Sequence, residues 1–186
     1  MNAGLRHSFV ISPATDCESE LFAPIVKSIK QVFRHDSLVT PLIRDVGFAL
    51  DPNRGQYHST LILEKLAEMA PEGAVKVIAL TRVDLFIPIL THVYGEAQLG
   101  GKACIVSTFR LKENLSPLTA QQTYIGRVVK EVIHELGHTF NLRHCPDSQC
   151  IMHYCRSIKD VDQKSDQLCR YCRVLIDDEL RRMARG

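Results

Sequence analysis

The sequence predicts an α+β fold in which helices pack on one side of a mixed, twisted sheet and a small annex follows at the C-terminal end. Three observations support this class. Short apolar segments alternate with amphipathic helical patterns over residues 8–109, one long amphipathic pattern follows, and a cysteine-rich segment comes last. With 186 residues and 45% hydrophobic content, the chain can bury one core of ordinary size, or a main domain with a small annex.

The first half of the chain shows strand and helix patterns separated by turn residues. The predicted strands are residues 8–12, 39–43 and 74–81, and the predicted helices are residues 18–34 and 59–69. Pro24 falls in the first turns of its helix, where proline is tolerated. Residues 51–55 have the composition of a turn. The third strand is a continuous apolar run that only Lys76 interrupts, which is typical of a buried strand.

The second half predicts two strands that meet at a glycine turn, and then a long helix. The strands are residues 91–97 and 103–109, the turn is residues 99–102, the long helix is residues 117–141, and a terminal helix covers residues 177–183. Thr119 is the expected N-cap of the long helix. Its apolar positions between Ile125 and Phe140 form a stripe that faces the core.

The long helix carries a pattern that is typical of a hydrolytic zinc site. His134 and His138 lie one helical turn apart on the same face, so both imidazoles can reach one metal ion. Glu135 is adjacent to this pair, where a carboxylate can accept a proton from water at the metal. The alternative for this pattern alone is a surface helix with two solvent-facing histidines.

His144 is the expected third ligand, which would leave the fourth zinc position open, as in catalytic sites. Six residues beyond His138, its side chain points away from the metal if the helix continues. The helix must therefore end between them. Asn141 is the expected stop, because asparagine readily adopts the left-handed conformation that closes helices.

A second metal site is predicted in the C-terminal segment. Cys145 and Cys150 form one pair, Cys169 and Cys172 form another, and two such pairs commonly hold a structural zinc with four thiolates. The sequence therefore predicts two zinc ions per chain, one catalytic and one structural. Disulfides and a redox-active C-x-x-C motif are the alternatives. Of the remaining cysteines, we expect Cys17 and Cys104 to be buried thiols and Cys155 to be a spare ligand at most.

Composition and charge limit the other classes of function. The formal net charge of +2 gives no indication of a nucleic-acid groove. Neither a signal peptide pattern at the N-terminus nor a stretch of membrane-spanning length is visible in the sequence. We therefore expect a cytoplasmic monomer that binds neither membrane nor nucleic acid. We divide the chain into residues 1–144, with sheet and long helix, and a small subdomain of residues 145–186, with the cleft between them.

The sequence resembles the archaemetzincins, a branch of the metzincin zinc peptidases. The resemblance rests on HELGHTFNLRHC at residues 134–145, CIM at 150–152 and CRYC at 169–172, with looser similarity at 51–59 and 94–107. It implies a zincin or metzincin-like fold with the metal ligands inferred above, and Glu135 as general base and acid. Metzincins usually carry glycine where this chain has Asn141.

The resemblance also implies roles around the cleft. Met152 falls at the Met-turn, the apolar floor beneath the metal in metzincins. Residues 92–97 correspond to a strand at the upper rim of the cleft, where a substrate peptide adds to a sheet edge. His92 and Glu96 are therefore candidates for substrate contact. Tyr154, two residues after the Met-turn methionine, is a candidate oxyanion donor, and a tyrosine packed against the annex is the alternative.

The expected function is zinc-dependent hydrolysis of peptide bonds. The partner would be a peptide substrate held in a narrow or shielded cleft. Two alternatives stay open. One is a structural or interaction protein with a vestigial zinc site, which would have no use for a base such as Glu135. The other is a nucleic-acid binder that uses residues 145–172 as a zinc ribbon, although aspartates dilute the positive charge of that segment.

Overall fold

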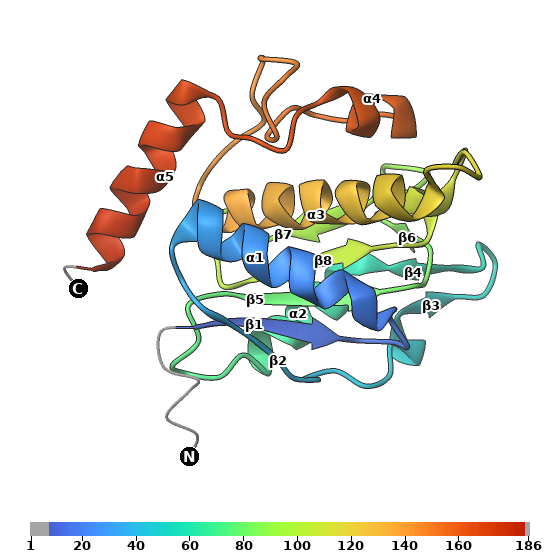
Figure 1. Cartoon of the computed structure of the whole chain (residues 1–186). Helices are drawn as coiled ribbons and strands as arrows, with labels where there is room; N and C mark the ends of the chain where they lie inside the picture. Colours follow the sequence, from blue (N-terminus) through green and yellow to red (C-terminus); the bar gives the residue numbers. More distant parts are fainter. Residues whose placement is uncertain (1–7, 185–186) are drawn as a thin grey trace.

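A five-stranded mixed sheet forms the centre of the computed structural model, which describes residues 8–184 (Figure 1). Its strands, in spatial order, are β2 (Ser37–Val39), β1 (Phe9–Pro13), β5 (Val77–Thr81), β8 (Ala103–Ser107) and β7 (Gly95–Ala97). The first four are parallel, and β7 is antiparallel to β8. The predicted α+β class is confirmed, and β7 stands at one edge of the sheet.

Helices cover both faces of this sheet, so the expectation that they lie on one side is wrong. Helices α1 (Phe22–Phe33) and α3 (Ala120–Thr139) cover one face, and α2 (Ser59–Glu68) covers the other (Figure 1). Along β1, Phe9 and Ile11 join the core beneath α1 and α3, whereas Val10 joins the core beneath α2. Every residue of β5 and β8 is buried, because helices cover both faces of the sheet and leave neither side of these strands exposed.

The second strand and the small strands depart from the prediction. The second strand is Ser37–Val39 and not residues 39–43, because its backbone pairs with β1 from Phe9 to Ile11 and then turns away. A smaller sheet contains β3 (Leu50–Asp51), β4 (Gln56–His58) and β6 (Leu85–Phe86). The predicted turn at residues 51–55 joins β3 to β4. A strand as short as β6 leaves too few residues for a recognisable alternation.

The helices agree with the predicted positions but differ at their ends. The long helix begins at Ala120, and Thr119 occupies the N-cap without a hydrogen bond from its side chain. The terminal helix is α5 (Arg170–Met183), longer than predicted, and α4 (Ile158–Gln163) was not predicted. Ser157 and Asp160 close the start of α4 as a capping box. Short 3₁₀ helices lie at Ser19–Leu21, Gly47–Ala49 and Arg110–Lys112.

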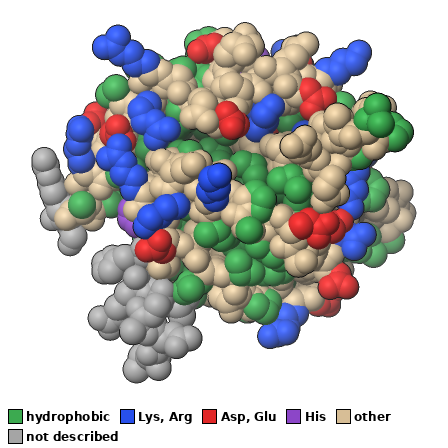
Figure 2. Space-filling model, in the orientation of Figure 1, with side chains coloured by type: hydrophobic (Ala, Val, Ile, Leu, Met, Phe, Trp, Pro, Cys, Tyr) green, Lys and Arg blue, Asp and Glu red, His purple; other side chains and the backbone are tan. Residues whose placement is uncertain are grey.

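The core beneath α1 and α3 continues into the C-terminal segment. Ile151, Met152, Val161 and Ile176 belong to the same buried cluster as Phe9. The predicted division at residue 144 therefore separates two parts that share a core, and it stays a prediction. In Figure 2, hydrophobic side chains also reach the surface near the middle of the face that carries α1. Among the described residues, no helix has the length and hydrophobicity needed to cross a membrane. The N-terminal residues 1–7, on which the expectation about a signal peptide partly rests, lie outside the described residues.

Candidate metal centres and cleft

Three histidines converge at the C-terminal end of α3. The ring centroids of His134 and His138 are 4.7 Å apart, and His144 lies 5.3 Å and 4.9 Å from them. The Nε2 atoms of His134 and His138 are 3.1 Å apart. Two nitrogens bound to one tetrahedral zinc at about 2.05 Å would be about 3.3 Å apart. The donor atoms of the three rings all lie within 4.8 Å of one another, so this set fits one ion.

Hydrogen bonds orient two of these rings toward the same point. The Nδ1 atom of His134 donates to the carbonyl oxygen of Ile151 at 2.9 Å, and that of His138 donates to Leu142 at 2.7 Å. A carbonyl can only accept, so both Nδ1 atoms carry the proton and both Nε2 atoms are left with a free lone pair. Burial lowers the pKa of His134 well below its ordinary value and that of His144 to about 4. Burial also lowers the pKa of His138, so the neutral imidazoles that metal binding requires are favoured at all three positions.

The chain between the second and third histidines turns as the sequence predicts. Helix α3 ends at Thr139, and Asn141 adopts the left-handed conformation with φ of 64°. The backbone N–H groups of Asn141 and Leu142 donate to His138 and Gly137, at 3.0 Å and 3.1 Å. These bonds satisfy carbonyls at the end of the helix and return the chain toward the pair of histidines.

Four cysteines form a second cluster next to the histidines. The sulfur atoms of Cys145, Cys150, Cys169 and Cys172 all lie within 4.8 Å of one another. Cys145 Sγ is 3.8 Å from Cys169 Sγ, and two thiolates on a tetrahedral zinc at about 2.3 Å would be about 3.8 Å apart. None of the seven cysteines forms a disulfide. The Cys172 backbone N–H donates to the Cys169 sulfur and lowers the pKa of that thiol. This donor set also fits a metal ion.

Glu135 lies beside the histidine cluster and against the edge strand β7. Burial raises the pKa of its carboxyl well above the ordinary value, and the nearby carboxylate of Glu131 adds to the rise. A Cβ atom at Gly95 would lie 2.6 Å from the Cγ atom of Glu135. Gly95 therefore leaves the space that the Glu135 side chain occupies. A cation at the histidines would favour the charged form of this carboxyl.

Sequence reasoning missed a buried ion pair behind the histidines. Lys164 Nζ lies 2.8 Å from Glu131 Oε1 and 3.4 Å from His134 Nδ1, and the Lys164 and Glu131 side chains are 0% and 4% exposed. Burial disfavours the ammonium, but Glu131, Cys155 and Glu135 together outweigh it, and the pKa of Lys164 is raised. Glu131 is one helical turn before Glu135, a spacing visible in the sequence. Nothing in the sequence pairs it with Lys164, which lies just past α4.

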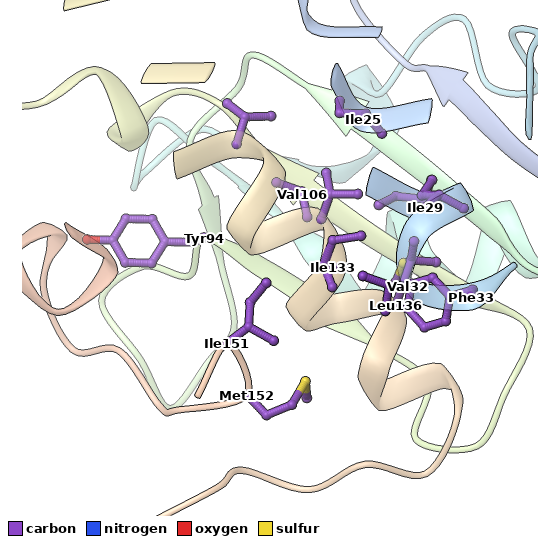
Figure 3. Close-up of a cluster of buried hydrophobic side chains, with 14 of the residues drawn as sticks. Ile25, Ile29, Val32, Phe33, Tyr94, Val106, Ile133, Leu136, Ile151 and Met152 are labelled. Atoms are coloured by element: carbon purple, nitrogen blue, oxygen red, sulfur yellow. The ribbon is translucent and has the colours of Figure 1, made fainter. Parts of the chain in front are cut away.

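The loop of residues 145–153, which begins at Cys145 and contains Cys150, packs against α3, the helix that carries His134 and His138. Figure 3 shows Ile151 and Met152 approaching α3 from this loop. Met152 is fully buried, and a Cβ atom at Gly137 would lie 2.5 Å from its sulfur. The backbone N–H of Cys145 donates to the carbonyl of Met152 at 2.9 Å. The same short loop therefore contacts the histidine helix and contributes a cysteine to the second cluster.

A cleft of about 430 Å³ opens in front of the histidines. Its lining includes His92, Glu135 and Tyr154, together with all three residues of β7. Tyr154 is 42% exposed, and the centroid of its ring lies 4.9 Å from that of His144. Cys155 also lines the cleft and is not part of the four-cysteine cluster.

The Glu96 side chain is engaged elsewhere. Its carboxylate accepts hydrogen bonds from Ser59, and from Thr60 at 2.9 Å and 3.1 Å, at the start of α2. Glu96 is acidic at a helix N-terminus, where a negative charge is stabilising. In this arrangement the Glu96 carboxylate already has hydrogen-bond partners in α2.

Comparison with known proteins identifies relatives over most of the chain. The sequence model of peptidase family M54 matches residues 19–178. Archaemetzincin of Methanopyrus kandleri is 43% identical over 129 residues, which cover 69% of this chain and 70% of the relative. Archaemetzincin of Methanocaldococcus jannaschii is 34% identical over 169 residues, which cover 90% of this chain and 92% of the relative.

Solved structures of such proteins share the fold. The crystal structure of Methanopyrus kandleri archaemetzincin aligns with a TM-score of 0.84 at 32% identity, covering 97% of this chain and 98% of that one. Archaeoglobus fulgidus archaemetzincin, crystallised with malonate, aligns with a TM-score of 0.77 at 32% identity, covering 90% and 99%. These alignments confirm the predicted metzincin-like fold and class of enzyme. The chain belongs to peptidase family M54, the family of the archaemetzincins.

Proposed function

We propose that this protein hydrolyses peptide bonds with two zinc ions per chain, a catalytic ion at the three histidines and a structural ion at the four cysteines. One observation carries the proposal. Two Nε2 lone pairs and the His144 ring converge at a cleft that also contains a buried carboxylate, Glu135. The four-cysteine set offers only sulfur donors, so an ion there has no open position for water or substrate.

In this proposal each group has a separate task. His134, His138 and His144 hold the catalytic ion. Zinc bound there would polarise the scissile carbonyl and lower the pKa of water. Glu135 accepts the proton from the attacking water and passes it to the leaving amine. Met152 is the apolar support beneath the histidine helix, through its contact with Gly137. The ion pair between Lys164 and Glu131 joins the C-terminal segment to α3.

The substrate is proposed to be a peptide that adds antiparallel to β7. This strand is at the edge of the sheet and lines the cleft, so its backbone groups on that side can pair with an incoming chain. His92, at the same wall, is a candidate for side-chain contact. For Glu96 we propose backbone contact alone. The cleft suits extended peptides better than folded proteins. We also propose that the protein acts as a cytoplasmic monomer.

The test of this function is cleavage of a mixed peptide library, followed by mass spectrometry. Protein loaded with zinc should contain two zinc ions per chain by elemental analysis and should generate new peptide ends. Protein treated with a chelator until the catalytic zinc is removed should generate no new peptide ends. Added zinc should restore cleavage. Zinc-loaded protein that cleaves no peptide, or cleavage that persists without zinc, would reject the proposal.

Tyr154 is proposed to donate its hydroxyl to the oxyanion that forms during hydrolysis. Its ring contacts His144 and lines the cleft, and an oxyanion donor contributes about 10²- to 10³-fold to kcat. The variant Tyr154→Phe, which keeps the ring, should therefore lower kcat by about 10²-fold with little change in KM. Steady-state kinetics measures both parameters. Unchanged turnover in this variant would dispose of the role.

A further inference from the structure

Lys76, the single charged residue in the apolar run of the third predicted strand, is buried immediately before β5. It is 8% exposed. Its Nζ atom donates to the carbonyl oxygens of Gly101 and Thr139, both at 2.7 Å, and lies 4.7 Å from the ring centroid of Phe140. Burial lowers its pKa to about 8, so enclosing this charge has a cost that an apolar residue would not have.

The two carbonyls belong to different parts of the catalytic region. Thr139 is the last residue of α3 and follows the proposed ligand His138. Carbonyls in the last turn of a helix lack intrahelical partners, and a cation there is favourable. Gly101 belongs to the turn between β7, the proposed substrate strand, and β8. One ammonium group therefore ties the end of the histidine helix to the turn beyond the edge strand.

This turn also contacts the helix end directly. The backbone N–H of Gly100 donates to the carbonyl of His138 at 2.9 Å. Gly100 has a positive φ of 67°, and a Cβ atom there would lie 2.5 Å from Oδ1 of Asn141. Asn141 is the left-handed residue that directs the chain to His144. The turn and the helix end thus fit against each other without space for a side chain on Gly100.

We propose that Lys76 is a positioning residue that fixes the edge strand β7 relative to the helix end that presents His138 and leads to His144. This inference rests on the function proposed above. Lys76 touches neither the metal donors nor the cleft, so it acts through the backbone of Thr139 and Gly101. Lys102 supplies a matched comparison, because it belongs to the same turn but its ammonium donates to the carbonyl of Ala74 and not to the end of α3.

The experiment compares the holoproteins of Lys76→Met, Lys76→Arg and Lys102→Met with wild type. Zinc retained per chain is measured against increasing concentrations of a chelator, and KM is measured with one cleaved peptide. Lys76→Met should release the catalytic zinc at an about tenfold lower chelator concentration than wild type, and its KM should be higher. Lys76→Arg keeps a cationic donor and should restore both values toward wild type. Lys102→Met should match wild type.

The proposal is overturned if Lys76→Met holds both zinc ions as tightly as wild type with an unchanged KM, even when its melting temperature falls. If Lys76→Met does not fold, Gly100→Ala perturbs the same contact from the turn and should release its first zinc early. Wild-type retention in that variant also overturns the proposal. A wild-type protein without zinc at the histidines would instead refute the proposed function, and with it this inference.

Discussion

Replacing Glu135 with glutamine should lower kcat/KM for peptide hydrolysis by about 10²- to 10⁴-fold, while zinc content stays at the wild-type level. Glutamine has the same shape, so it keeps the contact with Gly95 and the packing of α3. It cannot accept the proton from water or deliver it to the leaving amine. Glu135 is buried, lines the cleft and is adjacent in sequence to His134, which is why we assign the role of the base to this carboxylate.

The measurement combines cleavage of a peptide found in the library with elemental analysis and thermal unfolding. Glu68→Gln is the control, because that side chain is 69% exposed on α2 and remote from the cleft. It should leave cleavage unchanged. If Glu135→Gln retains more than about a tenth of wild-type activity with its zinc in place, another group is the base and the assignment fails.

The double variant Cys169→Ser with Cys172→Ser should lose activity and hold the catalytic zinc at least about tenfold more weakly. Two short connections between the clusters lead to this expectation, one through the backbone and one through a hydrogen bond. His144 is followed directly by Cys145, and Cys150 is followed by Ile151, whose carbonyl accepts the hydrogen bond from His134. Loss of the metal ion bound by the four cysteines would therefore leave His144 less firmly positioned. It would also weaken the hydrogen bond that orients His134.

Zinc content, measured as a function of chelator strength, tests this coupling. The double variant should fall well below one zinc per chain under conditions in which wild type keeps both. Cys17→Ser is the control, because Cys17 contacts Thr15 and Leu80 and lies outside the cluster. Retention of the first zinc at wild-type affinity in the double variant would show that the two clusters are independent.

The sequence was informative wherever the relevant residues are close along the chain. Helical spacing brings His134 and His138 together, Asn141 marks the turn to His144, and the cysteine pairs lie within short segments. Contacts between distant segments were not visible. The pairs Lys164 with Glu131 and Lys76 with Thr139 join residues 33 and 63 positions apart, respectively, and no local pattern records them.

The errors in the fold have the same origin. A short strand such as β2 is fixed by its parallel pairing with β1, and pairing partners cannot be read from three residues. The apolar run of β5 did contain the signal that both sheet faces are covered, but the position of α2 depends on the direction of the connection. Glu96 was placed correctly on the edge strand, yet its carboxylate is bound by α2, which only the assembled structure reveals.

The absence of a side chain at Gly95 bears on which peptide bond of a substrate would be hydrolysed. At this position the edge strand is bare backbone, and the carboxylate of Glu135 rests against it. A peptide paired with β7, as proposed above, would hold one of its peptide bonds opposite Gly95 and the others on either side of it. Backbone pairing with β7 would thus determine which peptide bond is hydrolysed, independently of the substrate's side chains.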